Sequence, residues 1–232
     1  MEHIIPGFVY ADPDGAHTFL IGTDSGLLYV FGDEKSSTFH DELVELYWKR
    51  VNEGERFTLF SSSQKWNEVL QERLSNEVSI IRRYAFSYRG DVDVRHRSLL
   101  PPDFTIQRID GDMIHKSIEF QDDYYAEYWG SVSNFLKNGL GFCVAYKGKV
   151  VSECTSIFKS ENFAEIDIAT HSDFRGKGLA LAAAQAFIDY CTVNNITPCW
   201  DCDVDNISSI KLAEKMGFTE PVTYSIIVKK RG

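Results

Sequence analysis

The sequence lacks any long hydrophobic run. No stretch approaches the about 20 consecutive apolar residues that a membrane-spanning helix requires. Residues 1–6 also lack a basic segment followed by an apolar one, so no secretory signal is predicted. We therefore expect no membrane partner.

Cysteine is sparse. The chain has 5 cysteines in 232 residues, an odd number, and they lie at Cys143, Cys154, Cys191, Cys199 and Cys202. A disulfide-stabilised secreted protein would carry a denser, even set, so these residues are expected to be free thiols. This pattern predicts a cytoplasmic protein.

Basic residues are outnumbered along the whole chain. The formal net charge is -10; residues 1–102 hold 16 acidic against 11 basic residues, and residues 103–232 hold 18 against 13. Neither half carries the basic footprint of a nucleic-acid or anionic-membrane binder. A local basic pocket for a small anion is still compatible with this charge.

The clearest break in the pattern is residues 95–102, which end in Pro101 and Pro102. Paired prolines favour an extended connection, so the predicted domains are residues 1–102 and residues 103–232. The first reads as a small α/β domain of uncertain role. Its expected strands are 8–10, 18–21, 27–31, 56–60 and 78–88, and its expected helices are 39–51 and 65–74.

The second part predicts a mostly antiparallel sheet flanked by helices. A strand over 104–109 precedes a helical, aromatic stretch over 114–136. The remaining expected strands are 141–146, 149–158, 164–170, 197–204 and 222–228, and the remaining helices are 178–192 and 206–216. The fold class is therefore α/β (α+β).

A glycine-rich turn between a strand and a helix carries the main functional signal. It reads Arg175-Gly176-Lys177-Gly178-Leu179-Ala180 and runs directly into an alanine-rich helix. A helix N-terminus presents unpaired N–H groups and a partial positive charge, so it binds phosphate well. Glycines let the backbone approach the anion, and the two basic residues add positive charge.

Spacing separates three anion-binding patterns that share this geometry. A P-loop requires Gly-Lys-Ser or Gly-Lys-Thr, but Gly178 follows Lys177. A dinucleotide fingerprint requires a small residue where Leu181 stands. The pattern Arg/Gln-x-x-Gly-x-Gly/Ala is matched in full by Arg175, Gly178 and Ala180.

With this motif, the chain resembles the GCN5-related N-acetyltransferase superfamily. A second match is the helix of residues 206–218, which ends in Gly217-Phe218. The run from Phe163 to Phe218 is similar to the zwittermicin-resistance acetyltransferase subfamily. The resemblance implies an N-acetyltransferase that moves an acetyl group from acetyl-CoA directly to an amine of a small molecule or peptide, with no metal.

The resemblance also implies roles for individual residues. The backbone of Ile168, Ala169 and Thr170 would meet the pantetheine arm of coenzyme A, and residues 175–180 would hold the pyrophosphate. Asn206 and Ser209 would contact the pantetheine or its phosphate side.

A base must take the proton of the ammonium nucleophile. Glu165, on the strand before the turn, is the first candidate, and Glu153, on the neighbouring strand, is the second. Many relatives carry a tyrosine as acid four residues before the Gly of Gly-Phe. Ala213 stands there, so another group or water would supply that proton.

Other interpretations stay open at this level. The absent tyrosine is compatible with a non-catalytic acyl-CoA-binding or regulatory module, and residues 1–102 could regulate the enzyme or join it into a homodimer. Cys199 and Cys202 lie three apart in an expected strand and face opposite sides, which disfavours a metal or redox site. The aromatic residues of 114–136 could line the acceptor pocket.

Overall fold

The computed structural model describes residues 4–12, 17–90 and 100–230. It divides into two compact units, one of residues 1–83 with 223–232 and one of residues 84–222. This division does not coincide with the boundary predicted near Pro102, and most of the break at 95–102 lies outside the described residues. Two long strands, β5 (Val78–Tyr88) and β11 (Phe218–Lys229), each run from one unit into the other.

The first unit contains four short strands, two helices and the end of β11. Its elements are β1 (Gly7–Ala11), β2 (Thr18–Thr23), β3 (Leu27–Gly32), α1 (Ser37–Asn52), β4 (Thr58–Ser61) and α2 (Gln64–Leu74). The strand order is β1-β2-β3-β4-β11. The pairs are antiparallel except β3–β4, which is parallel because α1 connects the two strands.

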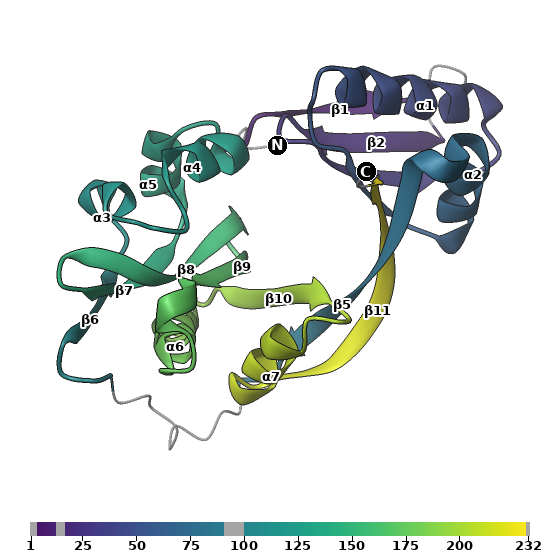
Figure 1. The fold of residues 1–232 in the computed structure, drawn as a ribbon. Coiled ribbons are helices and arrows are strands. Elements are labelled where there is room, and N and C mark those ends of the chain that lie inside the picture. Colours follow the sequence, from purple (N-terminus) through teal and green to yellow (C-terminus); the bar gives the residue numbers. More distant parts are fainter. Residues whose placement is uncertain (1–3, 13–16, 91–99, 231–232) are drawn as a thin grey trace. The chain divides into compact units, whose positions relative to one another are not determined.

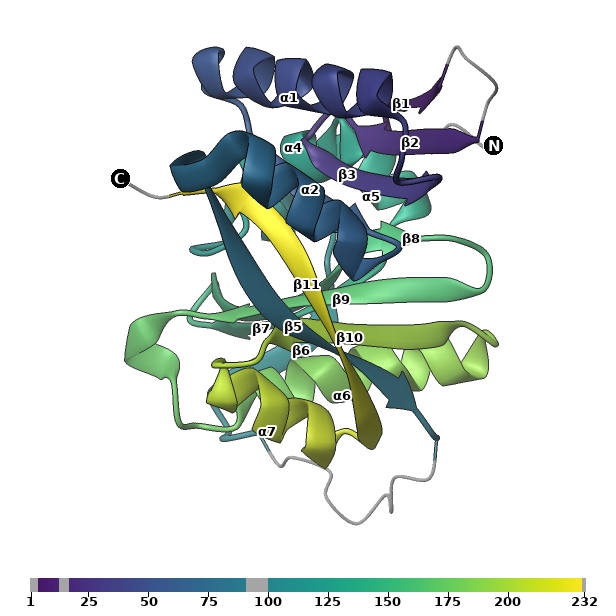
Figure 2. The ribbon, with the colours of Figure 1, turned by 90° about the vertical axis from the view of Figure 1, so that its right-hand side faces the viewer.

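Helices α1 and α2 bury one face of this sheet, and they lie side by side (Figure 2). Ser36 caps α1 by accepting a hydrogen bond from the Phe39 N–H. The core joins Leu28 and Leu59 of the sheet to Tyr47 of α1 and Trp66 of α2, all at 1% exposure or less.

The second unit begins with the end of β5 and closes with the start of β11. Between these lie β6 (Phe104–Arg108), α3 (Gly111–His115), α4 (Asp122–Trp129), α5 (Val132–Asn138), β7 (Gly141–Tyr146), β8 (Lys149–Lys159), β9 (Phe163–Thr170), α6 (Leu179–Val193), β10 (Thr197–Asp203) and α7 (Ile207–Lys215). The strand order is β10-β9-β8-β7-β6, with β9–β10 parallel and the other pairs antiparallel. The predicted fold class, a mixed and mostly antiparallel sheet flanked by helices, is confirmed.

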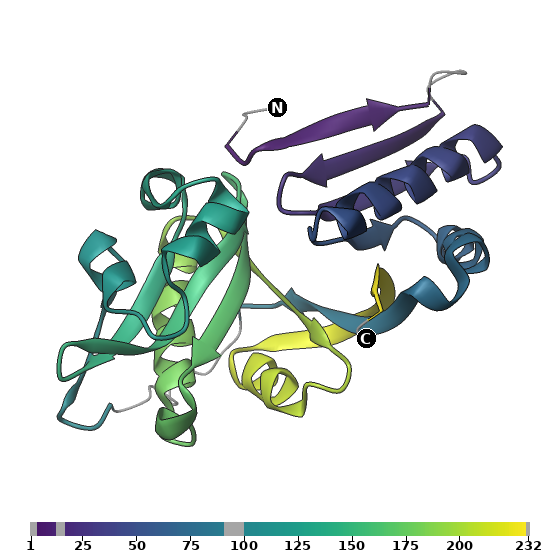
Figure 3. The ribbon, with the colours of Figure 1, turned by 45° about the horizontal axis from the view of Figure 1, so that its top comes forward.

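Helix α6 covers one face of this sheet, and α3 to α5 cover the other (Figures 1 and 3). The α6 face packs small residues such as Ala183 and Ala184 against Val151 and Cys154 of β8. The helical stretch predicted over 114–136 contains the end of α3, all of α4 and most of α5. Gly130 ends α4 in the left-handed conformation and Ser131 caps α5.

Candidate active site

The turn before α6 has the conformation that its glycines allow. Gly176 and Gly178 both have φ of 76°, in the left-handed region that favours glycine. A Cβ added at Gly176 would meet nothing within 4 Å, so the space beside this backbone is open. An anion can therefore come close to the main chain here.

The N-terminus of α6 presents its amides to this space. The first intrahelical bond runs from the Ala182 N–H to the Gly178 carbonyl at 3.1 Å. The N–H groups of residues 179–181 precede it, and Gly178 has no side-chain oxygen with which to cap them. A helix N-terminus of this kind, with the helix dipole behind it, suits an anion, and the binding of a pyrophosphate here stays a prediction.

Two exposed basic residues flank the turn. The Arg175 Nε donates to the Thr170 carbonyl at 3.0 Å, and the Lys177 Nζ donates to the Asp173 carbonyl at 3.3 Å. The first turn of α6 contains no acidic residue. The charge at this end of the helix is therefore positive in a protein whose net charge is negative.

Strands β9 and β10 are paired over a short distance and then diverge. Their parallel register covers three positions, of which the last pairs Cys199 with Glu165. Both strands continue, β9 to Thr170 and β10 to Asp203, and their course can be followed in Figure 1. The register of β9 with β10 therefore ends at Glu165, and the edge of β9 over residues 166–170 lies where the two strands diverge.

The residues predicted to contact pantetheine lie on this edge. On its other side, β9 is fully paired with β8: Ile168 with Cys154, Ala169 with Glu153 and Thr170 with Ser152. The Ser152 and Thr170 hydroxyls are 2.7 Å apart. This strand leads directly into the turn at 175–180, so the structure brings these two sets of predicted residues together.

The start of α7 is more strongly tied to structure than the sequence indicates. The Asn206 Oδ1 accepts from the Ser209 N–H at 3.1 Å and from the Ser208 hydroxyl at 2.8 Å. The Ser209 Oγ accepts from the Trp200 Nε1 of β10 at 3.0 Å. Asn206 therefore caps α7 and Ser209 fixes α7 against β10, and the contact of both residues with the cofactor stays a prediction.

Glu153 is a buried carboxylate on β8. It is 1% exposed, and its Oε1 accepts from the Ser117 hydroxyl and from the Phe120 N–H. Its Oε2 is buried with no hydrogen-bond partner among the described residues. Burial raises the pKa of Glu153 from its ordinary value of 4.5 to about 7, although the two donors oppose that rise.

This raised pKa predicts how stability depends on pH. Between pH 4.5 and about 7 the folded state holds a proton on Glu153 that the unfolded state has lost. The free energy of unfolding should therefore fall as pH rises through this window, by about 3 kcal/mol from this group. Glu153→Gln should remove that loss, which urea unfolding of both proteins at pH 5 and pH 8 would measure. If the free energy of unfolding changed equally with pH in the two proteins, the raised pKa would not belong to Glu153.

Glu165 is the more accessible of the two predicted bases. It is partly buried and lies at the last paired position before β9 and β10 diverge. Glu165, Asp167 and Ala169 share one face of β9, and Glu153 lies on that face because it pairs with Ala169. Ala169 is four positions beyond Glu165, so the backbone of Glu165 and that of the residue paired with Glu153 lie about 13 Å apart along the strand.

Asp167 is a further acidic residue on this face that the sequence analysis did not identify. Its Oδ2 accepts from the Tyr124 hydroxyl of α4 at 2.8 Å. Burial and the carboxylate of Asp167 raise the pKa of Tyr124 well above its ordinary value. Tyr124 was among the aromatic candidates, and the signal for Asp167 was its period-two spacing from Glu165.

Ala213 is fully buried, at 0% exposure, in the core below α6 and α7. A tyrosine there would have to displace packed neighbours. We expect Ala213→Tyr to lower the free energy of unfolding by about 3 kcal/mol or more, without raising kcat, because overpacking is costly. Thermal unfolding and a turnover assay would check this; a stable variant with a raised kcat would contradict it.

The cysteines of β10 diverge as their spacing predicts. Cys202 is buried in the core with Trp200, whereas Cys199 is partly exposed beside Glu165 on β9. Within the described ranges, no group of three or more His, Cys, Asp and Glu side chains is placed to hold a metal ion. None of the helices described is both long and apolar enough to span a bilayer.

Comparison with known proteins gives the class to which this chain belongs. The sequence model of the GNAT acetyltransferase family matches residues 1–227, and the chain belongs to this family. The family match therefore includes the first 102 residues as well as the part that contains the glycine-rich turn. The predicted enzyme class, an acyltransferase, is confirmed.

Individual relatives agree with this membership. The chain is 45% identical over 227 residues to the uncharacterized N-acetyltransferase YdfB of Bacillus subtilis. The aligned region covers 97% of this chain and 87% of the relative. A GCN5-related N-acetyltransferase-like protein from Streptococcus suis superposes with a TM-score of 0.80 at 27% identity, over 97% of this chain and 89% of that one. A GCN5-related N-acetyltransferase from Kribbella flavida shares the fold, with a TM-score of 0.61 at 11% identity over 98% and 90%.

Proposed function

We propose that the protein transfers an acetyl group from acetyl-CoA to an amine of a small molecule or peptide. The observation that carries this proposal is the gap between β9 and β10 beside the open N-terminus of α6. An open helix N-terminus and a strand edge at the point where two strands diverge, joined by one continuous segment of chain, suit a ligand with a pyrophosphate and an amide-bearing arm.

The residues of this segment suit coenzyme A both in their chemistry and in their order along the chain. The amides at 176–181 and the side chains of Arg175 and Lys177 would hold the pyrophosphate. The edge of β9 at Ile168, Ala169 and Thr170 would bond the amides of the pantetheine arm as a further strand would. When bound, acetyl-CoA supplies the activated acyl group.

Glu165 is the proposed base. It lies where the gap between the strands begins and is accessible, so a nucleophile at that point can reach it. The carboxylate would accept the proton that the ammonium group loses before the amine attacks the thioester carbonyl. The tetrahedral intermediate then expels the thiolate, and no acyl group is transferred to the enzyme.

Glu153 has a different proposed role. At 1% exposure, with one oxygen bound to Ser117 and Phe120, it does not contact a substrate amine directly. Its side chain holds the segment before α4 against β8. Glu153 is therefore a positioning residue for the sheet face on which Glu165 and Asp167 lie.

The chemistry of this face favours a cationic acceptor. Asp167 and Glu165 present carboxylates beside the gap, and Tyr124 adds an aromatic ring. A protonated amine is attracted to such a face before it loses its proton. Water supplies the proton to the leaving thiolate in this scheme, because Ala213 offers none.

Release of the free thiol from acetyl-CoA tests the proposal. The assay would use the full chain, a library of small amines and peptides with free amino groups, and reactions without amine as the blank. We expect thiol release that depends on the amine and an acetylated product in the mass spectrum. Saturable binding of acetyl-CoA without turnover across the library would overturn the proposed transfer.

A further inference from the structure

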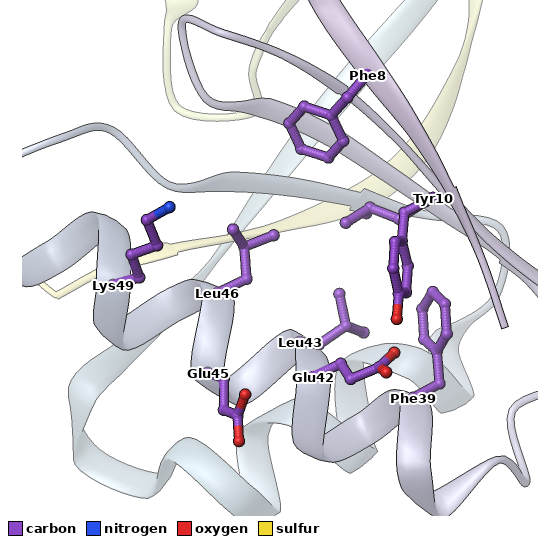
Figure 4. Close-up of a pocket in the computed structure, with 9 residues that line it drawn as sticks. Phe8, Tyr10, Phe39, Glu42, Leu43, Glu45, Leu46 and Lys49 are labelled. Carbon is purple, nitrogen blue, oxygen red and sulfur yellow. The ribbon is translucent and has the colours of Figure 1, made fainter. Parts of the chain in front are cut away.

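A pocket lies in the first unit, outside the elements that form the candidate active site. It has a volume of about 540 Å³, and its lining comes from β1, from Leu20 of β2 and from one side of α1 (Figure 4). The lining residues are Phe8, Tyr10, Leu20, Phe39, Glu42, Leu43, Glu45, Leu46 and Lys49. Its size is that of a small-molecule site.

The lining follows from two sequence periods. Phe8 and Tyr10, two residues apart, point from β1 to the same side. Phe39, Leu43 and Leu46 are three or four residues apart and form one stripe on α1. The middle of the pocket is therefore apolar and suits a hydrocarbon chain or ring.

One end of the pocket carries an incompletely satisfied carboxylate. The Glu42 carboxylate lies beside the Tyr10 hydroxyl (Figure 4). The hydrogen bond to Glu42 raises the pKa of Tyr10 to about 12, so this hydroxyl stays protonated. The Glu42 Oε2 is buried with no hydrogen-bond partner in the described part of the chain. A buried oxygen of this kind is costly until a donor meets it.

The other end carries the opposite charge. Lys49 follows Glu42 by seven residues, which is about 10 Å along α1. Figure 4 shows its ammonium group beyond Leu46, away from the carboxylate. This placement favours one positive charge near Glu42 and disfavours a second one at the far end.

We propose that this pocket binds an alkyl or arylalkyl monoamine, with its ammonium group on Glu42 and its apolar body between Phe8, Leu43 and Leu46. The ammonium group donates to the unsatisfied oxygen, and the chain fills the apolar middle. The pocket is a ligand site separate from the proposed transferase chemistry, and it operates in the absence of acetyl-CoA.

A matched series of six-carbon probes tests this site by calorimetry on the full chain without acetyl-CoA. The series is hexylamine, hexanol, hexanoate and 1,6-diaminohexane. We expect hexylamine to bind about tenfold more tightly than hexanol, because a charge-assisted hydrogen bond is added. The diamine should bind less tightly than hexylamine, and hexanoate least tightly. Equal affinity for hexylamine and hexanol would overturn the proposal.

Two variants locate the binding. Glu42→Gln should lower hexylamine affinity about tenfold and leave hexanol affinity unchanged. Glu72→Gln, an exposed change of the same charge on α2 that does not line the pocket, should leave both unchanged. Leu46→Trp, which fills the middle, should abolish binding of both while the far-ultraviolet circular dichroism stays the same. Hexylamine binding that survives Glu42→Gln and Leu46→Trp undiminished would place the ligand elsewhere and overturn the proposal.

Discussion

Glu165→Gln is expected to lower kcat by about 10² to 10⁴-fold, the usual contribution of a general base. The amide keeps the shape of the side chain but cannot accept the proton of the ammonium nucleophile. Because Glu165 is not among the predicted cofactor contacts, acetyl-CoA affinity should stay within about twofold of the wild type. Steady-state thiol release and calorimetry with acetyl-CoA would measure the two quantities.

Glu161→Gln is the matched control for this prediction. Glu161 is exposed in the connection between β8 and β9, four residues from Glu165, and the change removes the same charge. Its kcat should equal that of the wild type. Two results together would reverse the proposed roles and make Glu153 the base. Glu165→Gln would retain full kcat while Glu153→Gln loses it, and the kcat of the wild type would rise with pH around 7.

Gly178→Asp is expected to weaken acetyl-CoA binding on the order of 100-fold, equivalent to about 3 kcal/mol. The new carboxylate would stand at the N-terminus of α6, where it repels the pyrophosphate and competes for the same amides. Asp tolerates the left-handed conformation of this position better than most residues do. The fold should therefore survive, and calorimetry of the folded variant reports on binding alone.

Gly148→Asp provides the comparison for that change. Gly148 has φ of 79° in the turn between β7 and β8, and an added Cβ meets nothing within 4 Å. The variant carries the same new charge at a similarly left-handed position of the same unit, yet it should bind acetyl-CoA like the wild type. Equal binding by Gly178→Asp and the wild type would show that the pyrophosphate does not lie at α6.

Much of the cofactor-binding half could be predicted because its signals are local. Gly176, Gly178 and the first turn of the helix that follows them lie within about two helical turns of sequence, so their periodicity and spacing determine their conformation. Asn206 caps α7 as its residue type and position indicate. The hairpin of β7 and β8 likewise follows from Lys147 and Gly148 at its turn.

The remainder depends on contacts between residues distant in sequence, which no local pattern contains. The divergence of β9 and β10 depends on the register of Glu165 with Cys199, with 33 residues of chain between them. The burial of Glu153 depends on Ser117 and Phe120, which lie in another segment altogether. The paired prolines predict a division near Pro102 because that break is visible in the local sequence. The division into two units instead depends on β5 and β11, which both cross between the units.

The pocket beside Glu42 was not predicted for the same reason. One wall comes from β1 with Leu20 of β2, and the other comes from α1, which follows β2 in sequence only after a further strand. The stripe of Phe39, Leu43 and Leu46 reads from sequence as an ordinary core face. In the structure, the part of the stripe that lines the pocket is marked by Tyr10, which lies opposite Glu42.

The proposed site for acetyl-CoA is the start of α6 with the adjoining edge of β9. Acetyl-CoA would be titrated into the ¹⁵N-labelled full chain while the backbone amide resonances are followed. We expect saturable shifts concentrated at residues 166–170 and 176–181. No saturable change in these amides at millimolar acetyl-CoA would contradict this proposed site.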